Sequence, residues 1–250
     1  MICIRKISAI MEMKVKALMS KNFLIMMLFS IGYGYLMKTI IGEVSTYALS
    51  MAVLFNIAMA LYVTALLLAE EKEKNTLRVL MTSSVRGIEY FLGTVFPIFI
   101  EVEIINVILA LLLGVTMSPY VWIIYLLMTS LATLSCTMIG MIFGIFAKIQ
   151  MNTSSIITPA VIILMLIPMF SELLPFMKVI SECLFTGIVM NVINKLSYAN
   201  ISVSLIQWCI LSSECIITLL LFLILYKEMG LSLISKYHIQ INNQNSKLSL

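Results

Sequence analysis

Six long apolar runs dominate this chain of 250 residues and limit what it can fold into. Each run offers about 20 residues with few charges, the length that an α-helix needs to cross a hydrocarbon core of about 30 Å. The sequence is 62% hydrophobic and 11% charged, whereas soluble domains carry about 25% charged residues. We therefore predict an all-α membrane protein with six transmembrane helices, at about residues 22–41, 47–69, 88–117, 120–146, 154–176 and 203–226.

The segments outside these spans predict further local structure. Residues 2–20 mix basic and apolar side chains, which suits an interfacial helix in the headgroup plane, and a frayed polar start fits nearly as well. The apolar run Leu184–Ile193 is too short to cross the membrane and favours re-entrant or interfacial helices on the outer face. We treat 1–230 as a single transmembrane domain and 231–250 as a polar cytosolic tail, disordered at its end.

The basic residues set the predicted orientation. Thirteen of the 16 Lys and Arg residues fall on one side of the six-span arrangement, and only Lys38, Lys178 and Lys195 fall on the other. Because short cytosolic loops are enriched in Lys and Arg, we predict a multi-pass plasma-membrane protein with both termini and the loop at 70–87 in the cytosol. The net charge of +4 follows from this topology, so it does not indicate nucleic-acid binding.

Counting residues excludes several catalytic chemistries. The chain has no Asp, and its single His, His238, lies in the tail. It has no HExxH motif, no CxxC pair, no Ser–His–Asp set and no GxxxxGK[ST] phosphate-binding loop. Glu70 and Glu71 form a pair like that of glutamate-type intramembrane proteases, but those enzymes also need histidines within the membrane. We predict a protein that is not an enzyme and that binds no metal or cofactor by itself.

A charged, helix-prone segment at residues 70–93 separates the second and third spans. Its ions cannot face lipid, because each would cost a few kcal/mol at the bilayer centre. Leu77, Leu80 and Met81 share one helical face by their i, i+3, i+4 spacing. We interpret the segment as a short amphipathic helix outside the membrane that docks a soluble partner, and the alternative is a solvated loop.

Three carboxyls lie deep in the predicted spans. Glu101 and Glu103 fall near the middle of the third span, and Glu214 lies at a similar depth in the sixth. Such carboxyls usually face the protein interior and mark functional sites. Glu101 and Glu103 point about 200° apart, so one can face the bundle and the other a second protomer, while Glu103 aligns with Asn106. These four residues are candidates for a substrate path. A structural role, with the carboxyls protonated or bonded to Ser or Thr, fits the sequence equally well.

The charged segment also resembles a motif in the permease subunits of type-2 ABC exporters. EKEKNTL at 71–77, LMTSSV at 80–85 and EYFLG at 89–93 look like that family's E-x-E-x-G-T-L segment, its L-x-x-S/T-P-V turn and its E-x-x-x-G entry to the third span. The sequence departs from the pattern at Asn75, Ser84 and Thr94, where Gly, Pro and a basic residue are usual. The six-span topology, with outer helices before the last span, is similar to that family as well.

The resemblance implies a subunit that works with a separate cytosolic ATP-binding ABC subunit. In the family this loop is the coupling helix that sits in a cleft of the ATPase, which implies a docking surface of Asn75, Thr76, Leu77, Arg78, Leu80, Met81 and Ser84. ATP would act through that partner. A homodimer, or a heterodimer with a related permease, would move an amphipathic or hydrophobic substrate such as a peptide antibiotic or a drug-like molecule. The alternatives are a proton-coupled secondary transporter and a non-transporting scaffold or immunity subunit.

Thiol labelling tests the predicted orientation. Thr76→Cys and Asn243→Cys should be shielded from an impermeant thiol reagent in intact cells, because both positions are predicted to be cytosolic. Asn194→Cys, in the outer segment, should react in a background from which Cys183 has been removed. Reaction at position 76 in intact cells would overturn the orientation.

Overall fold

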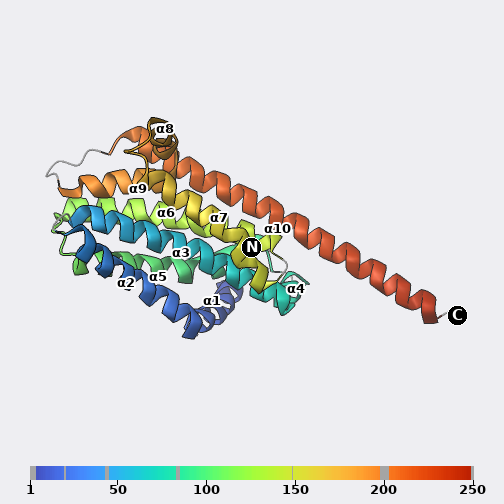
Figure 1. Cartoon of the computed structure of the whole chain (residues 1–250). Coiled ribbons are helices and arrows are strands. Elements are labelled where there is room, and N and C mark those ends of the chain that lie inside the picture. Colours follow the sequence, from blue (N-terminus) through green and yellow to red (C-terminus); the bar gives the residue numbers. More distant parts are fainter. Residues whose placement is uncertain are drawn as a thin grey trace.

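The computed structural model describes residues 4–19, 21–42, 45–82, 85–147, 149–197 and 203–248, and every regular element within these ranges is helical (Figure 1). The helices are α1 (Ile4–Leu18), α2 (Lys21–Ile41), α3 (Ser45–Glu73), α4 (Thr76–Thr82), α5 (Gly87–Leu112), α6 (Pro119–Phe146), α7 (Gln150–Met169), α8 (Pro175–Cys183), α9 (Phe185–Asn194) and α10 (Leu205–Leu248), with a 3-10 turn at Lys195–Ser197. The chain is therefore a helical membrane protein, as its apolar runs predict.

Five of the described helices are long and apolar enough to cross a membrane: α3, α5, α6, α7 and the Leu205–Glu228 part of α10. The part of α2 whose side chains are described is shorter than a span. α8 and α9 together would make another candidate, but they meet at an angle of 101°. The number of six spans stays a prediction.

Helix ends differ from the predicted spans where the chain turns. α5 ends at Leu112 instead of 117, because Gly114 adopts a φ of +70° that glycine tolerates best. α7 ends at Met169 instead of 176, and Pro175 begins α8. α10 continues to Leu248, so the end of the tail, which is predicted to be disordered, is helical in the structure. No proline lies between 205 and 248 to interrupt it.

α3 is the central helix of the bundle and packs against α2, α5, α6, α7 and α9. In the most apolar stretch of each helix, 78% of the residues of α3 are buried, compared with 17% for α7 and 11% for α10. α7 and α10 are therefore peripheral, and in Figure 1 α10 extends well beyond the bundle. Their apolar faces are free for lipid or for another chain.

α9 is buried inside the bundle and does not lie on its surface. Phe185, Ile188, Val189 and Val192 join the main core together with side chains of α3 and α6. α8 is exposed along most of its length, with Val179 as an example. Of the two arrangements that the sequence predicts for residues 184–193, the burial of α9 favours the re-entrant one.

Two glycines set the close approach of α6 to α3. Gly140 and Gly144 have the GxxxG spacing that lets membrane helices approach closely. A Cβ at Gly140 would lie 2.1 Å from Thr64 Oγ1 and 2.5 Å from the carbonyl oxygen of Leu61. A Cβ at Gly144 would lie 2.8 Å from Cβ of Leu68. Any side chain at either position would push the two helices apart.

Gly140→Ala should therefore destabilise the protein, by about 1–3 kcal/mol for overpacking. Gly32→Ala in α2 is the matched control, because a Cβ there meets nothing within 4 Å. The control should be neutral or stabilising by about 0.5–1 kcal/mol, since alanine is the better helix former. Thermal unfolding of the purified variants in detergent measures both changes. Equal stability of Gly140→Ala and the parent chain would contradict the close packing of α3 on α6.

Candidate functional site

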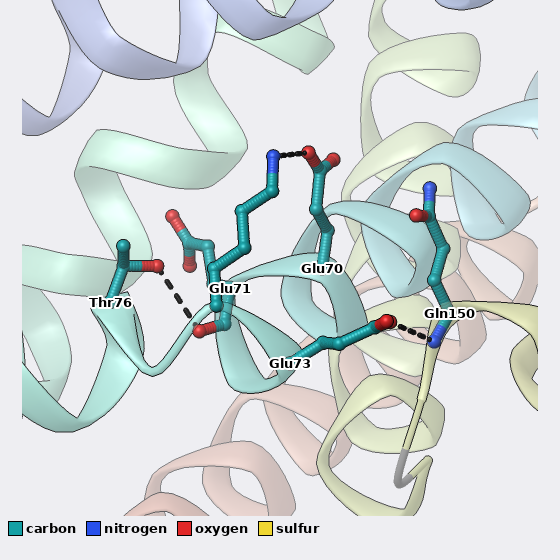
Figure 2. Close-up of polar contacts among 6 residues, drawn as sticks. Glu70, Glu71, Glu73, Thr76 and Gln150 are labelled. Atoms are coloured by element: carbon teal, nitrogen blue, oxygen red, sulfur yellow. Dashed lines mark hydrogen bonds and ion pairs between the residues drawn. The ribbon is translucent and has the colours of Figure 1, made fainter.

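The last turn of α3 directs a series of charged side chains toward different neighbours. Successive helical residues point about 100° apart, so Glu70, Glu71, Lys72 and Glu73 face four directions. Figure 2 shows the carboxylates of Glu70, Glu71 and Glu73 spread around the helix end. Glu70 pairs with Lys74 one turn later, on the exposed side. Glu71 and Lys72 are partly buried, and Glu73 is exposed but bonds to a neighbouring helix.

Glu71 forms a salt bridge with a buried lysine of α1. The Nζ atom of Lys14 lies 2.8 Å from Oε1 of Glu71, and its side chain is only 2% exposed. Burial lowers the pKa of Lys14, and the neighbouring charge of Glu71 opposes that shift. The Tyr90 hydroxyl donates to the second carboxylate oxygen of Glu71. Tyr90 in turn stacks on Tyr226 with ring centroids 5.4 Å apart, so the cluster joins α1, α3, α5 and α10.

Lys72 and Glu73 each bind the end of another helix. Lys72 donates to the carbonyl oxygens of Ile145 and Ala147 at the end of α6. Glu73 accepts a 2.9 Å hydrogen bond from the backbone N–H of Gln150, the first residue of α7 (Figure 2). The carbonyl end of a helix carries partial negative charge and the amide end partial positive charge. Each side chain therefore meets a helix end of opposite sign.

The chain reverses between α3 and α4 at Asn75. Its φ is +57°, in the left-handed region that Asn tolerates better than most residues. The Thr76 hydroxyl then donates to the carbonyl oxygen of Glu71 at 3.1 Å (Figure 2). Gly is usual at this position in the permease motif that the segment resembles. Asn75 adopts a backbone conformation that favours Gly, so this departure from the motif is conservative in structure.

The apolar stripe of α4 packs within the chain. Leu77 is 1% exposed and joins Phe91 and Phe222 in a core cluster, and Leu80 packs against the same cluster. Thr76 and Val79 of α4 are exposed instead, together with Asn75 just before it. The protein's own core therefore covers Leu77 and Leu80, which the sequence predicts to dock a partner. Their spacing predicts an apolar helical face but does not indicate which surface covers that face. The side chains of Arg78 and Met81, and all of Ser84, lie outside the described residues.

A second polar cluster lies at mid-span, around Glu103 of α5. Thr129 of α6 donates to Oε2 of Glu103 at 2.8 Å, and Thr133 donates to Oε1 at 3.0 Å. Asn106 lies one turn away, with its Nδ2 atom 3.4 Å from Oε1. Glu103 and Asn106 therefore form one polar patch, as their spacing predicts.

Asn106 extends this cluster to α3. Its Oδ1 atom accepts a 2.8 Å hydrogen bond from Nδ2 of Asn56, which also donates to the carbonyl oxygen of Val102. The Tyr125 hydroxyl donates to the backbone carbonyl of Asn106 at 2.8 Å. The cluster therefore links α3, α5 and α6 at a depth where water cannot satisfy polar groups.

The other two carboxyls predicted to line a path lie elsewhere. Glu101 faces away from Glu103 and lines a groove between α1, α2 and α5. Glu214 of α10 lies near the backbone of Phe185, where α9 begins, and its Oε2 atom is buried without a hydrogen-bond partner among the described residues. The structure thus joins Glu103 with Asn106 and leaves Glu101 and Glu214 separate.

Lys14, Asn56, Thr129 and Thr133 complete these clusters and were not predicted from the sequence. The two threonines share a face of α6 by their i, i+4 spacing, and Asn56 interrupts an otherwise apolar run. Both patterns can be recognised in the sequence and could have identified these residues. Lys14 carries no such signal, because it resembles the other basic residues of the amino-terminal segment.

The chain matches no protein-family model and no curated protein sequence. The two polar clusters, the exposed part of α4 and the helices that hold them are the features that bear on its function.

Replacing Glu71 tests the buried cluster at the end of α3. Glu71→Gln removes the carboxylate that contacts the buried Lys14 ammonium, so the free energy of unfolding should fall by about 3 kcal/mol. Glu70→Gln is the matched control on the adjacent residue. It removes a pair whose lysine is 66% exposed and should cost less than about 1 kcal/mol. Denaturant titration in detergent measures both changes.

The double variant Lys14→Met, Glu71→Gln should regain much of the lost stability, because no unpaired charge then remains buried. Equal stabilities of Glu71→Gln and Glu70→Gln would show that Lys14 is solvated in the folded protein and would contradict the cluster.

Proposed function

We propose that this chain is the transmembrane permease subunit of an ATP-driven exporter of the type-2 ABC kind. In this proposal it lies in the plasma membrane with both termini in the cytosol, and a separate ATP-binding subunit supplies the energy. The observation that carries the proposal is the position of α4. Asn75, just before α4, and Thr76 and Val79 within it are exposed, while Thr76 at its start is bonded to the last turn of α3.

The contacts of α4 suit a helix that transmits force. Leu77 belongs to the same core cluster as Tyr90 and Phe91 of α5 and Phe222 of α10, and Thr76 is bonded to the backbone of α3. A displacement of α4 by a partner would therefore act on three long helices at once. The ions beside it tie the end of α3 to α1, α6 and α7, so the motion would reach much of the bundle.

The peripheral helices leave room for a second permease. The apolar faces of α7 and α10 are largely uncovered by the rest of the chain. In the proposed assembly another copy, or a related permease, faces this chain, and the two line the substrate path. Because the uncovered faces are overwhelmingly apolar, the proposed substrate is amphipathic or hydrophobic, such as a peptide antibiotic or a drug-like molecule.

The Glu103 cluster favours a second candidate, a proton-coupled transporter. The Thr129 hydroxyl has one proton, and both Glu103 Oε2 and the carbonyl oxygen of Tyr125 lie within hydrogen-bond distance, at 2.8 Å and 3.0 Å. It can donate to an ionised Glu103, or donate to Tyr125 and accept from a protonated Glu103. The cluster therefore accommodates both protonation states. Transport that persists after ATP depletion while a proton gradient is held would favour this candidate, and binding without flux would favour a scaffold.

Docking on α4 can be tested with a matched pair of valines. Val79 of α4 is 65% exposed, and Val179 of α8 is 64% exposed. Val79→Glu should abolish co-purification of an ATP-binding protein that carries GxxxxGK[ST], together with its ATPase activity, because it places a charge in the docking surface. Val179→Glu should retain both.

Both variants must reach the membrane at parental levels and unfold at the parental temperature. Equal recovery of the ATPase with Val79→Glu would remove α4 as the docking site. Failure of any protein with that motif to co-purify with the parent chain would refute the exporter proposal.

A further inference from the structure

A groove of about 410 Å³ lies between α1, α2 and α5, away from the polar cluster of Glu103. Its volume falls within the range of about 300–1,000 Å³ that small-molecule sites occupy. Its described lining is apolar except for one carboxyl: Met11, Val15, Leu18, Met19, Leu28, Ile31, Phe96, Pro97, Ile100, Glu101, Ile104 and Ile105. The groove is therefore an apolar surface with a single ionisable group.

Glu101 differs from Glu103 in having no partner. Three side-chain donors surround Glu103, whereas no described residue forms a hydrogen bond or an ion pair with the carboxyl of Glu101. Glu101 lies 14 residues after Gly87, or about 21 Å along the helix. At that depth an ionised carboxylate is costly unless a cation lies against it.

The nearby lysines whose side chains are described are committed to other partners. Lys14 of α1 binds Glu71 on the inner side of that helix, and Lys16 pairs with Glu12 at 2.7 Å. None of the residues that line the groove is basic. The positive charge that would satisfy Glu101 is thus missing from the described part of the chain.

We infer that the groove binds a lipophilic cation. The positive charge lies against Glu101, and the apolar body contacts Phe96, Ile104 and Met11, whose flexible thioether adapts to irregular ligands. This inference rests on the proposed export function and names a substrate class for it, and it places the binding groove at α1, α2 and α5 instead of on the faces of α7 and α10. The binding step itself needs no ATPase, so it can be measured on the isolated chain.

A lipid acyl chain is the competing occupant, and charge separates the two. An acyl chain would use the apolar walls and gain nothing from Glu101. A cation would depend on that carboxylate and would be favoured over an anion of the same shape. Tetraphenylphosphonium and tetraphenylborate form such a pair, because they share their four phenyl groups and differ in the sign of their charge.

The test is equilibrium dialysis of both ions against the purified chain in a non-ionic detergent, with empty micelles subtracted. Glu101→Gln should weaken tetraphenylphosphonium binding about tenfold or more, which corresponds to about 1.4 kcal/mol, and should not weaken tetraphenylborate binding. Glu12→Gln, which removes an exposed carboxylate of α1, is the matched control and should change neither. Ile104→Trp fills the groove and should weaken both ions.

Thermal unfolding provides the fold control. Glu101→Gln breaks no hydrogen bond of the described residues, so it should unfold at or above the parental temperature. Unchanged cation binding in Glu101→Gln would overturn the inference. Equal effects on both ions, with displacement of both by added phospholipid, would assign the groove to an acyl chain and overturn it as well. Neither result would bear on ATPase docking at Val79, so the two proposals fail separately.

Discussion

The fold depends on how α3 ends. At the end of α3 four charged residues follow its buried apolar length, and the charges that neighbouring helices cover need partners of opposite sign, because an unpaired buried ion is costly. Lys14, the carbonyl end of α6 and the amide end of α7 are these partners. Each of these contacts places one helix relative to α3, so the charges that exclude this segment from lipid also organise one end of the bundle.

In the apolar part of α3, before its charged end, close packing and hydrogen bonds fix the positions of the neighbouring helices. Lipid tails are as apolar as leucine, so membrane helices gain little from hiding apolar side chains from them. Specific contacts must fix the arrangement instead. Gly140 and Gly144 bring α6 within reach of the backbone of α3, and the bonds from Asn56 through Asn106 to Glu103 fix α5 against both. α7 and α10 are far less covered within the chain and remain peripheral.

The sequence predicts what composition and helical geometry determine directly. Apolar runs of about 20 residues indicate helices, and the two-residue separation of Glu101 and Glu103 places them on different sides of α5. It does not predict what depends on the identity of a neighbour. The stripe that contains Leu77 would look the same whether a partner or the chain's own core covered it. The burial of Lys14 likewise depends on Glu71, which is 57 positions away in the chain.

The burial of α9 shows the same limit for a whole helix. The length of α9 excludes a full span, but only the surrounding α3, α6, α7 and α10 decide that it is buried in the bundle. The observed ends of α5 and α7 differ from the predicted ends for a local reason. Gly114 and Pro175 mark turns inside apolar runs that hydropathy alone treats as continuous.

α1 connects the two proposals physically. Its inner side is held by the ion pair of Lys14 with Glu71 and by the packing of Ile10 on Gly93, whereas Met11 and Val15 line the groove. Glu71 also accepts the bond from Thr76 through its backbone, so α4, Glu71, Lys14 and the groove form one continuous series of contacts. In the proposed exporter, a partner that displaces α4 would shift α1 and change the shape of the groove beside Glu101. The buried lysine then serves as a mechanical link as well as a counter-charge, which gives a reason to keep it where a methionine would pack at lower cost.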